Sequence, residues 1–153
     1  MKQHTCTSDL SYSKMIKTYG DFLELQLYTH YVTITTKYPL TLKSARNLAE
    51  RFGNQLNYNG VVAEMFWVAE SFDTKEGNHI HALVKLIGTD ITTPINRIKV
   101  AAKNAIGVNI KGMDYKNTKI YPYQPKLGAN YYISKYLNKP ITDYDIYLPS
   151  KIM

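Results

Sequence analysis

Cysteine is almost absent from this chain of 153 residues, where Cys6 is the only one. A single thiol cannot form an internal disulfide, and it excludes zinc or redox sites built on paired cysteines. Long hydrophobic runs are missing too, since apolar stretches such as 61–63 and 65–69 are far too short to cross a bilayer. The first residues lack the apolar segment of a secretory signal, so we expect a cytoplasmic protein that does not enter membranes.

Acidic residues are the scarcer charged group, with 12 Asp and Glu against 19 Lys and Arg and a net charge of +7. Because 44% of the residues are apolar and 20% are charged, the composition is that of a globular domain. We expect an N-terminal extension over 1–20, one domain over 21–140 and a C-terminal extension over 141–153. The positive charge favours a polyanionic partner such as nucleic acid.

Hydrophobic periodicity predicts strands and helices in alternation. The predicted strands are 31–36, 61–70, 79–87 and one or two within 108–123. The predicted helices are 42–56, 94–106 and about 129–138. The polar segment 71–78 joins two nearly continuous apolar strands, which makes 61–87 a β-hairpin. The order indicates an α+β fold, a mostly antiparallel sheet with flanking helices.

Two histidines and a carboxylate converge at the end of this hairpin. His79 and His81 are two residues apart on one strand, so both imidazoles project from the same face. Glu70 ends the preceding strand, across the turn from His79, about 5 Å away in a hairpin. Imidazole and carboxylate ligands suit a divalent metal with open coordination positions. Histidines at this spacing also occur on solvated strands, where they bind nothing.

Tyrosines and lysines repeat in the last predicted helix as two Y-x-x-K motifs, Tyr132 to Lys135 and Tyr136 to Lys139. A lysine one turn away stabilises a phenolate or protonates a leaving oxygen, which makes each tyrosine a candidate nucleophile. Tyr131 also has Lys135 one turn away, so helix geometry alone leaves it as a third candidate. A tyrosine stripe of this kind also packs into protein cores.

The two elements together resemble HUH endonucleases of the rolling-circle replication initiator (Rep) type, named for histidine, bulky hydrophobic, histidine. His79-Ile80-His81 matches that motif, and residues 132–139 are similar to the two-tyrosine motif of gene A-type initiators of small single-stranded-DNA phages. Thr33-Ile34-Thr35 resembles their first conserved strand, and Glu70 stands where their third metal ligand is often found. The resemblance covers about residues 28–140 and implies a ferredoxin-like or RRM-like fold.

The resemblance implies site-specific nicking and joining of single-stranded DNA. Mg²⁺ or Mn²⁺ on His79, His81 and Glu70 would polarise the scissile phosphate, and Tyr132 or Tyr136 would attack it to give a 5′-phosphotyrosyl enzyme and a free 3′-OH. The family register favours Tyr132 over Tyr131, and of Tyr132 and Tyr136 we expect Tyr132 to attack first. The implied partners are an origin DNA, with a hairpin, and a host helicase and polymerase, since the sequence has no P-loop.

Lysines interleaved with tyrosines suit a groove for single-stranded DNA, although a solvated face has the same composition. The candidate DNA-binding residues are Lys111, Lys116, Lys119 and Lys126. Two other settings keep the same chemistry, a mobilisation relaxase and a single-strand transposase. A different class, a nucleic-acid-binding module without catalysis on the same ferredoxin-like scaffold, remains the alternative.

Overall fold

The computed structural model describes residues 21, 23, 26–36, 38–57, 62–87, 94–107, 118–124 and 143–148. The chain divides into two compact units, residues 1–27 with 124–140 and residues 28–123 with 141–153. Every named helix and strand belongs to the second unit. In the described part of the chain, no helix is long and apolar enough to cross a membrane.

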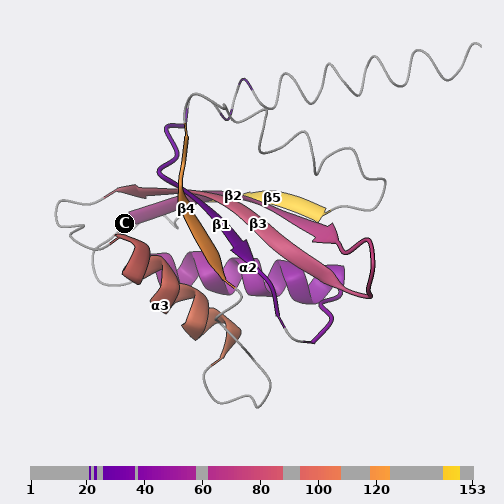
Figure 1. The fold of residues 1–153 in the computed structure, drawn as a ribbon. Coiled ribbons are helices and arrows are strands. Elements are labelled where there is room, and N and C mark those ends of the chain that lie inside the picture. The colour runs from indigo at the N-terminus through magenta and orange to yellow at the C-terminus, as the bar shows by residue number, and fades with distance from the viewer. Residues whose placement is uncertain are drawn as a thin grey trace, which may run out of the picture. The chain divides into compact units, whose positions relative to one another are not determined.

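A five-stranded antiparallel sheet forms the centre of the second unit, with strand order β4-β1-β3-β2-β5 (Figure 1). The strands are β1 (His30–Ile34), β2 (Val62–Ser71), β3 (Asn78–Ile87), β4 (Lys119–Pro122) and β5 (Asp143–Tyr147). The helices α2 (Leu42–Leu56) and α3 (Pro94–Ile106) both cover one face of this sheet. The predicted α+β fold is confirmed. The first four strands and the two helices follow a ferredoxin-like or RRM-like arrangement, to which β5 adds an edge strand.

Both helices begin and end where the sequence predicts. Thr41 caps α2 by accepting a hydrogen bond from the Ser44 amide at 3.1 Å. Pro94 occupies the first position of α3, where its missing N–H costs nothing, and Gly107 follows the last turn with a φ of 105°. The apolar face of each helix is buried against the sheet.

The β2–β3 hairpin matches the predicted one to within a residue at each end. Its turn is closed by the Phe72 amide, which donates to the Gly77 carbonyl at 3.1 Å. Gly77 has a φ of 107°, and a Cβ there would lie 2.8 Å from Pro39 Cα, so only glycine fits. The turn therefore fixes the register that sets Glu70 directly opposite His79.

Strand β2 is buried on both of its faces, which explains why its sequence is apolar without alternation. Met65 and Trp67, each 1% exposed, point into the core beneath the helices. Phe66 and Val68 are buried on the opposite face. Trp67 is thus a core residue, as its apolar neighbours suggest.

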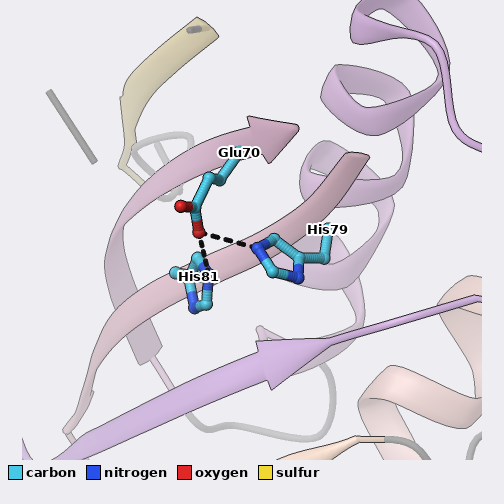
Figure 2. A group of neighbouring side chains, drawn as sticks. All are labelled: Glu70, His79 and His81. Carbon is cyan, nitrogen blue, oxygen red and sulfur yellow. Dashed lines mark hydrogen bonds and ion pairs between the residues drawn. The ribbon is translucent and has the colours of Figure 1, made fainter. Parts of the chain in front are cut away.

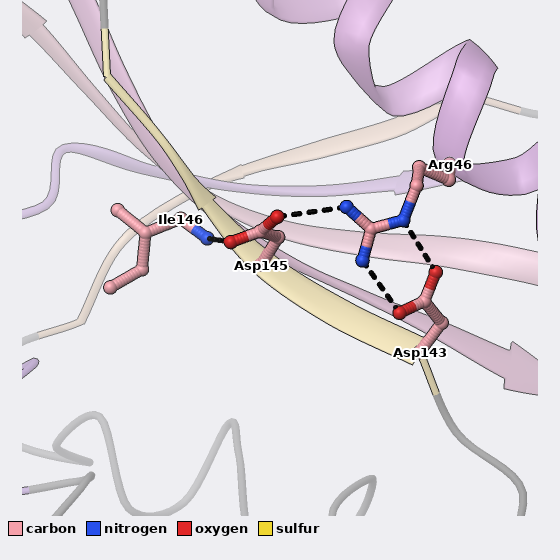
Figure 3. A network of polar contacts seen from close by, with 4 residues as sticks. All are labelled: Arg46, Asp143, Asp145 and Ile146. Carbon is pink, nitrogen blue, oxygen red and sulfur yellow. Dashed lines mark hydrogen bonds and ion pairs between the residues drawn. The ribbon is translucent and has the colours of Figure 1, made fainter.

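Strand β5 lies in the C-terminal segment, for which the sequence predicts no strand. It pairs with β2 from Asp143 opposite Ala69 to Tyr147 opposite Met65. Arg46 of α2 donates hydrogen bonds to both Asp143 and Asp145, and Figure 3 shows the guanidinium between the two carboxylates. An ion-paired side chain from the helix layer therefore holds this polar strand at the sheet edge.

Several predictions fall outside the described residues. They concern the N-terminal extension over 1–20, any strand within 108–117 and the helix at about 129–138. Of the predicted strands within 108–123, the structure describes one, β4.

Candidate metal centre

Glu70, His79 and His81 gather on the sheet face opposite the helices (Figure 2). Glu70, the penultimate residue of β2, pairs directly with His79 of β3, so the two side chains share a face. His81 is two residues farther along β3 and returns to that face. Ile80, between the histidines, points into the core and is fully buried. The predicted grouping of the three residues is therefore confirmed.

One carboxylate oxygen joins the three side chains. Glu70 Oε2 lies 2.7 Å from His79 Nε2 and 2.9 Å from His81 Nε2. One ligand atom from each residue lies within 4.8 Å of the other two. Two imidazoles and a carboxylate suit a divalent ion, and three protein ligands leave positions open for another molecule. The cluster could hold a metal ion.

The cluster is partly shielded from solvent, with exposed side-chain fractions of 13% for Glu70, 20% for His79 and 10% for His81. The Phe72 and His79 rings form a T-shaped pair with 4.5 Å between ring centroids. Lys75 Nζ lies 4.3 Å from the centre of the same phenyl ring. Charges near Glu70 therefore interact more strongly than they would in bulk water.

Two hydroxyl groups of β1 contact the remaining nitrogen of His81. Its Nδ1 lies 2.8 Å from the Tyr31 hydroxyl and 3.1 Å from Thr33 Oγ1. The rings of Tyr31 and His81 are parallel within 1°, with centroids 6.0 Å apart. The sequence pattern predicts a role for neither hydroxyl. Alternation along β1 puts them on one face, but only the pairing of β1 with β3 shows that they meet His81.

Of the four predicted DNA-binding lysines, Lys119 is the one that lies within the described residues. It is exposed and pairs with Thr33, which in turn pairs with His81, so these side chains form a row on the metal-centre face. Tyr121 of β4 pairs with Tyr31 on the same face and is 52% exposed. The sheet therefore presents a cation and an aromatic ring two strands away from His81.

The remaining predicted site residues lie outside the described residues. These are the tyrosines and lysines of the Y-x-x-K motifs, Tyr132, Lys135, Tyr136 and Lys139, the alternative nucleophile Tyr131, and the DNA-binding candidates Lys111, Lys116 and Lys126.

His30 is also described but does not belong to the cluster. It lies on β1 in the same alternation as the buried Val32 and Ile34, which point toward the helices. Its Nδ1 is 2.9 Å from Thr29 Oγ1, and burial lowers its pKa below the ordinary value for imidazole.

Comparison with models of protein families, with curated proteins and with solved structures finds no match to this chain.

Proposed function

We propose that this chain is a metal-dependent endonuclease and strand transferase that acts on single-stranded DNA and initiates rolling-circle replication. One observation carries the proposal: the side chains of Glu70, His79 and His81 meet at one carboxylate oxygen. They lie on the sheet face opposite the helices, where Lys119 is in the same cross-strand row as His81. The resemblance of residues 79–81 and 132–139 to HUH initiators supplies the reaction. The metal is Mg²⁺ or Mn²⁺, and both accept such a ligand set.

The reaction is a transesterification, in which a tyrosine oxygen replaces the 3′ oxygen on the scissile phosphate. A metal held by Glu70, His79 and His81 would supply Lewis-acid stabilisation of the charge on the scissile phosphate. The Tyr132 hydroxyl loses its proton and its oxygen attacks phosphorus, while the bond to the 3′ oxygen breaks. That oxygen takes a proton and becomes the free 3′-OH, and the 5′ phosphate stays on tyrosine. A later 3′-OH reverses the exchange and seals the strand without ATP.

The two lysines and the second tyrosine have supporting roles in this proposal. Lys135 and Lys139 stabilise the developing phenolate or protonate the leaving oxygen. Tyr136 cleaves the regenerated origin while Tyr132 still holds DNA. A host helicase and polymerase supply unwinding and synthesis.

Chain connectivity supports a tyrosine nucleophile from the segment before β5. That segment runs into Asp143, the first residue of β5, which pairs with Ala69 beside Glu70. Tyr136 precedes Asp143 by seven residues, a span of at most about 25 Å. Asp143, the described residue to which that segment leads, therefore pairs one residue away from the metal-centre residue Glu70.

Lys119 and Tyr121 support contact with single-stranded nucleic acid. A lysine neutralises a phosphate, and an exposed tyrosine offers a surface on which a base stacks. Both lie on the metal-centre face of β4, an edge strand. A single strand of DNA that crosses β4 and β1 would bring one of its phosphates to Glu70, His79 and His81.

A covalent-adduct assay tests the proposal. The full chain is incubated with hairpin-containing single-stranded oligonucleotides and Mn²⁺, and the products are separated under denaturing conditions. We expect a protein–DNA band that a chelator abolishes, that is largely lost in Tyr132→Phe and that is absent when Tyr132 and Tyr136 are both changed. Mass spectrometry of the DNA-linked peptide then identifies the attacking residue.

Other outcomes contradict specific parts of the proposal. Full adduct in the double variant would exclude both tyrosines and direct attention to Tyr131. Retardation of DNA without any cleavage would favour the binding module. Cleavage confined to a transfer origin or a transposon end would favour a relaxase or a single-strand transposase.

A further inference from the structure

Both ring nitrogens of His81 have polar partners: Glu70 Oε2 lies 2.9 Å from Nε2, and two hydroxyls lie beside Nδ1. An ionised carboxylate only accepts hydrogen bonds, so with Glu70 ionised the hydrogen belongs on Nε2. Nδ1 is then the acceptor, and the hydroxyls of Tyr31 and Thr33, at 2.8 and 3.1 Å, are in position to donate to it.

Metal coordination by the same Nε2 requires the opposite tautomer. A metal binds the lone pair of a neutral imidazole, so the hydrogen must move to Nδ1, which then needs an acceptor. A carbonyl or carboxylate at Nδ1 would serve this second tautomer alone, because neither can donate. A hydroxyl serves both, because it rotates about its C–O bond to donate or to accept.

We propose that Tyr31 and Thr33 are positioning residues that let His81 exchange its hydrogen bond to Glu70 for a bond to a metal. In one tautomer Nε2–H donates to Glu70 and a hydroxyl donates to Nδ1. In the other, Nε2 binds the metal and Nδ1–H donates to a hydroxyl. One proton leaves Nε2 and one arrives at Nδ1, so the ring stays neutral.

Burial favours a partner that can serve both tautomers. The His81 side chain is only 10% exposed, so a nitrogen without a partner would remain desolvated and unsatisfied in one of the two tautomers. His79 is the natural comparison, because within the described residues it contacts Glu70, His81 and the Phe72 ring, and none of these contacts is with a hydroxyl.

The same geometry argues against Tyr31 as a nucleophile. Its hydroxyl contacts Nδ1, whereas Glu70 contacts Nε2. The phenol and the carboxylate therefore lie beside different edges of the imidazole, and Tyr31 acts on the metal centre through His81. This inference rests on the metal site of the proposed function, but it does not require DNA cleavage.

Nitrogen NMR of the full chain tests the proposal directly. Long-range ¹H–¹⁵N spectra of histidine-labelled protein at pH 8 distinguish the two neutral tautomers, and Zn²⁺ is a diamagnetic probe for histidine and carboxylate ligands. We expect His81 to carry hydrogen on Nε2 before Zn²⁺ is added and on Nδ1 afterwards. The combined Tyr31→Phe and Thr33→Val variant should bind Zn²⁺ about 10- to 100-fold more weakly.

Conservative variants separate this role from a structural one. Thr33→Ser keeps a hydroxyl and should keep the Zn²⁺ affinity and the change of tautomer, even if the double variant fails to fold. Tyr147→Phe removes a hydroxyl that donates to Asn54 of α2, on the helix side of the sheet, and should change neither.

Three results would overturn the inference: hydrogen on Nδ1 of His81 before Zn²⁺ is added, a doubly protonated ring, or unchanged Zn²⁺ affinity in a folded double variant. A protein that changes tautomer with Zn²⁺ but forms no DNA adduct would keep this inference and contradict the nuclease proposal. A protein that forms the DNA adduct but keeps hydrogen on Nε2 of His81 in the presence of Zn²⁺ would keep the nuclease proposal and contradict this inference.

Discussion

Arg46 and Asp143 lie 97 residues apart in the chain and face each other through two hydrogen bonds, from Nε at 2.9 Å and from Nη2 at 2.7 Å. Arg46 Nη1 also donates to Asp145 at 2.8 Å, and the guanidinium carbon lies 5.1 Å from the centre of the Trp67 ring. A single side chain of α2 thus connects the last strand to the helix layer and the core.

Replacing Arg46 by alanine should detach β5 from the rest of the sheet. Hydrogen bonds to charged groups contribute about 1.5–3 kcal/mol when buried, but the Arg46 side chain is 36% exposed, so we expect a loss of about 1–2 kcal/mol in the free energy of unfolding. Urea unfolding followed by Trp67 fluorescence measures this loss. Arg46→Lys should recover less than half of it, because an ammonium cannot bridge both oxygens of Asp143.

Acid should weaken the same attachment. The hydrogen bond from Arg46, with a second one from the Ile146 amide, holds the pKa of Asp145 below its ordinary value. A lowered folded-state pKa means that Asp145 contributes stability above its unfolded pKa of about 3.9 and loses it as the pH falls through the folded value. The effect is small, because Asp145 is 55% exposed.

Urea midpoints between pH 5 and pH 3 check this prediction. Asp145→Asn should make the midpoint fall less steeply with decreasing pH than it does in the wild type. Equal slopes in the two proteins would show that the Arg46 contact does not hold the Asp145 carboxylate in solution.

The sequence predicts the features that depend on short separations along the chain. Helix α2 follows from the spacing of its apolar residues and from Thr41 at its start. The cluster follows from alternation on two strands joined by one turn, since Glu70 is only 9 and 11 residues from the two histidines. Local geometry therefore determines that the side chains of Glu70 and the two histidines lie together.

The sequence does not predict features that depend on distant pairing. Tyr31 is 50 residues from His81, and their contact exists only because β1 pairs with β3. Strand β5 has the sequence DYDIY, which lacks an apolar run. Its attachment depends on Arg46, a residue that the helical pattern identifies only as part of a polar face.

Glu70→Gln tests the metal centre without a change in side-chain shape. The amide lacks the negative charge that draws a cation, so we expect Mn²⁺ affinity to fall at least about tenfold, the lower end of what loss of an outer-shell partner causes. Electron paramagnetic resonance of free Mn²⁺ measures it. Glu64→Gln is the matched control, since Glu64 lies on the same face of β2 and faces Lys85 instead. An equal loss in both variants would mean a general charge effect.

Lys119→Ala should weaken binding to single-stranded oligonucleotides and reduce its dependence on salt. Each phosphate contact contributes about 0.7 to the slope of log K against log salt concentration for single strands, so the slope should become shallower by about that amount. Fluorescence anisotropy at several salt concentrations gives the slope. Lys43→Ala is the control, because that exposed lysine lies on α2, on the opposite side of the sheet. Identical slopes in the two variants would exclude a phosphate contact at Lys119.

Gly53 sits inside α2, where its replacement by alanine would normally stabilise the helix by about 1 kcal/mol. Here the new Cβ would lie 2.7 Å from Cδ2 of Tyr147, closer than real contacts allow. Displacing that ring also disturbs the hydrogen bond of 2.6 Å from its hydroxyl to Asn54 Oδ1. Overpacking costs about 1–3 kcal/mol, so we expect Gly53→Ala to destabilise the protein.

The sign of the Gly53→Ala effect should reverse once Tyr147 is shortened. In a Tyr147→Ala background the clash is gone and the helical preference of alanine remains, so the second substitution should stabilise the protein by up to about 1 kcal/mol. Urea unfolding of the wild type, both single variants and the double variant completes the cycle. Stabilisation by Gly53→Ala in the wild type would mean that β5 does not hold Tyr147 against α2 in solution.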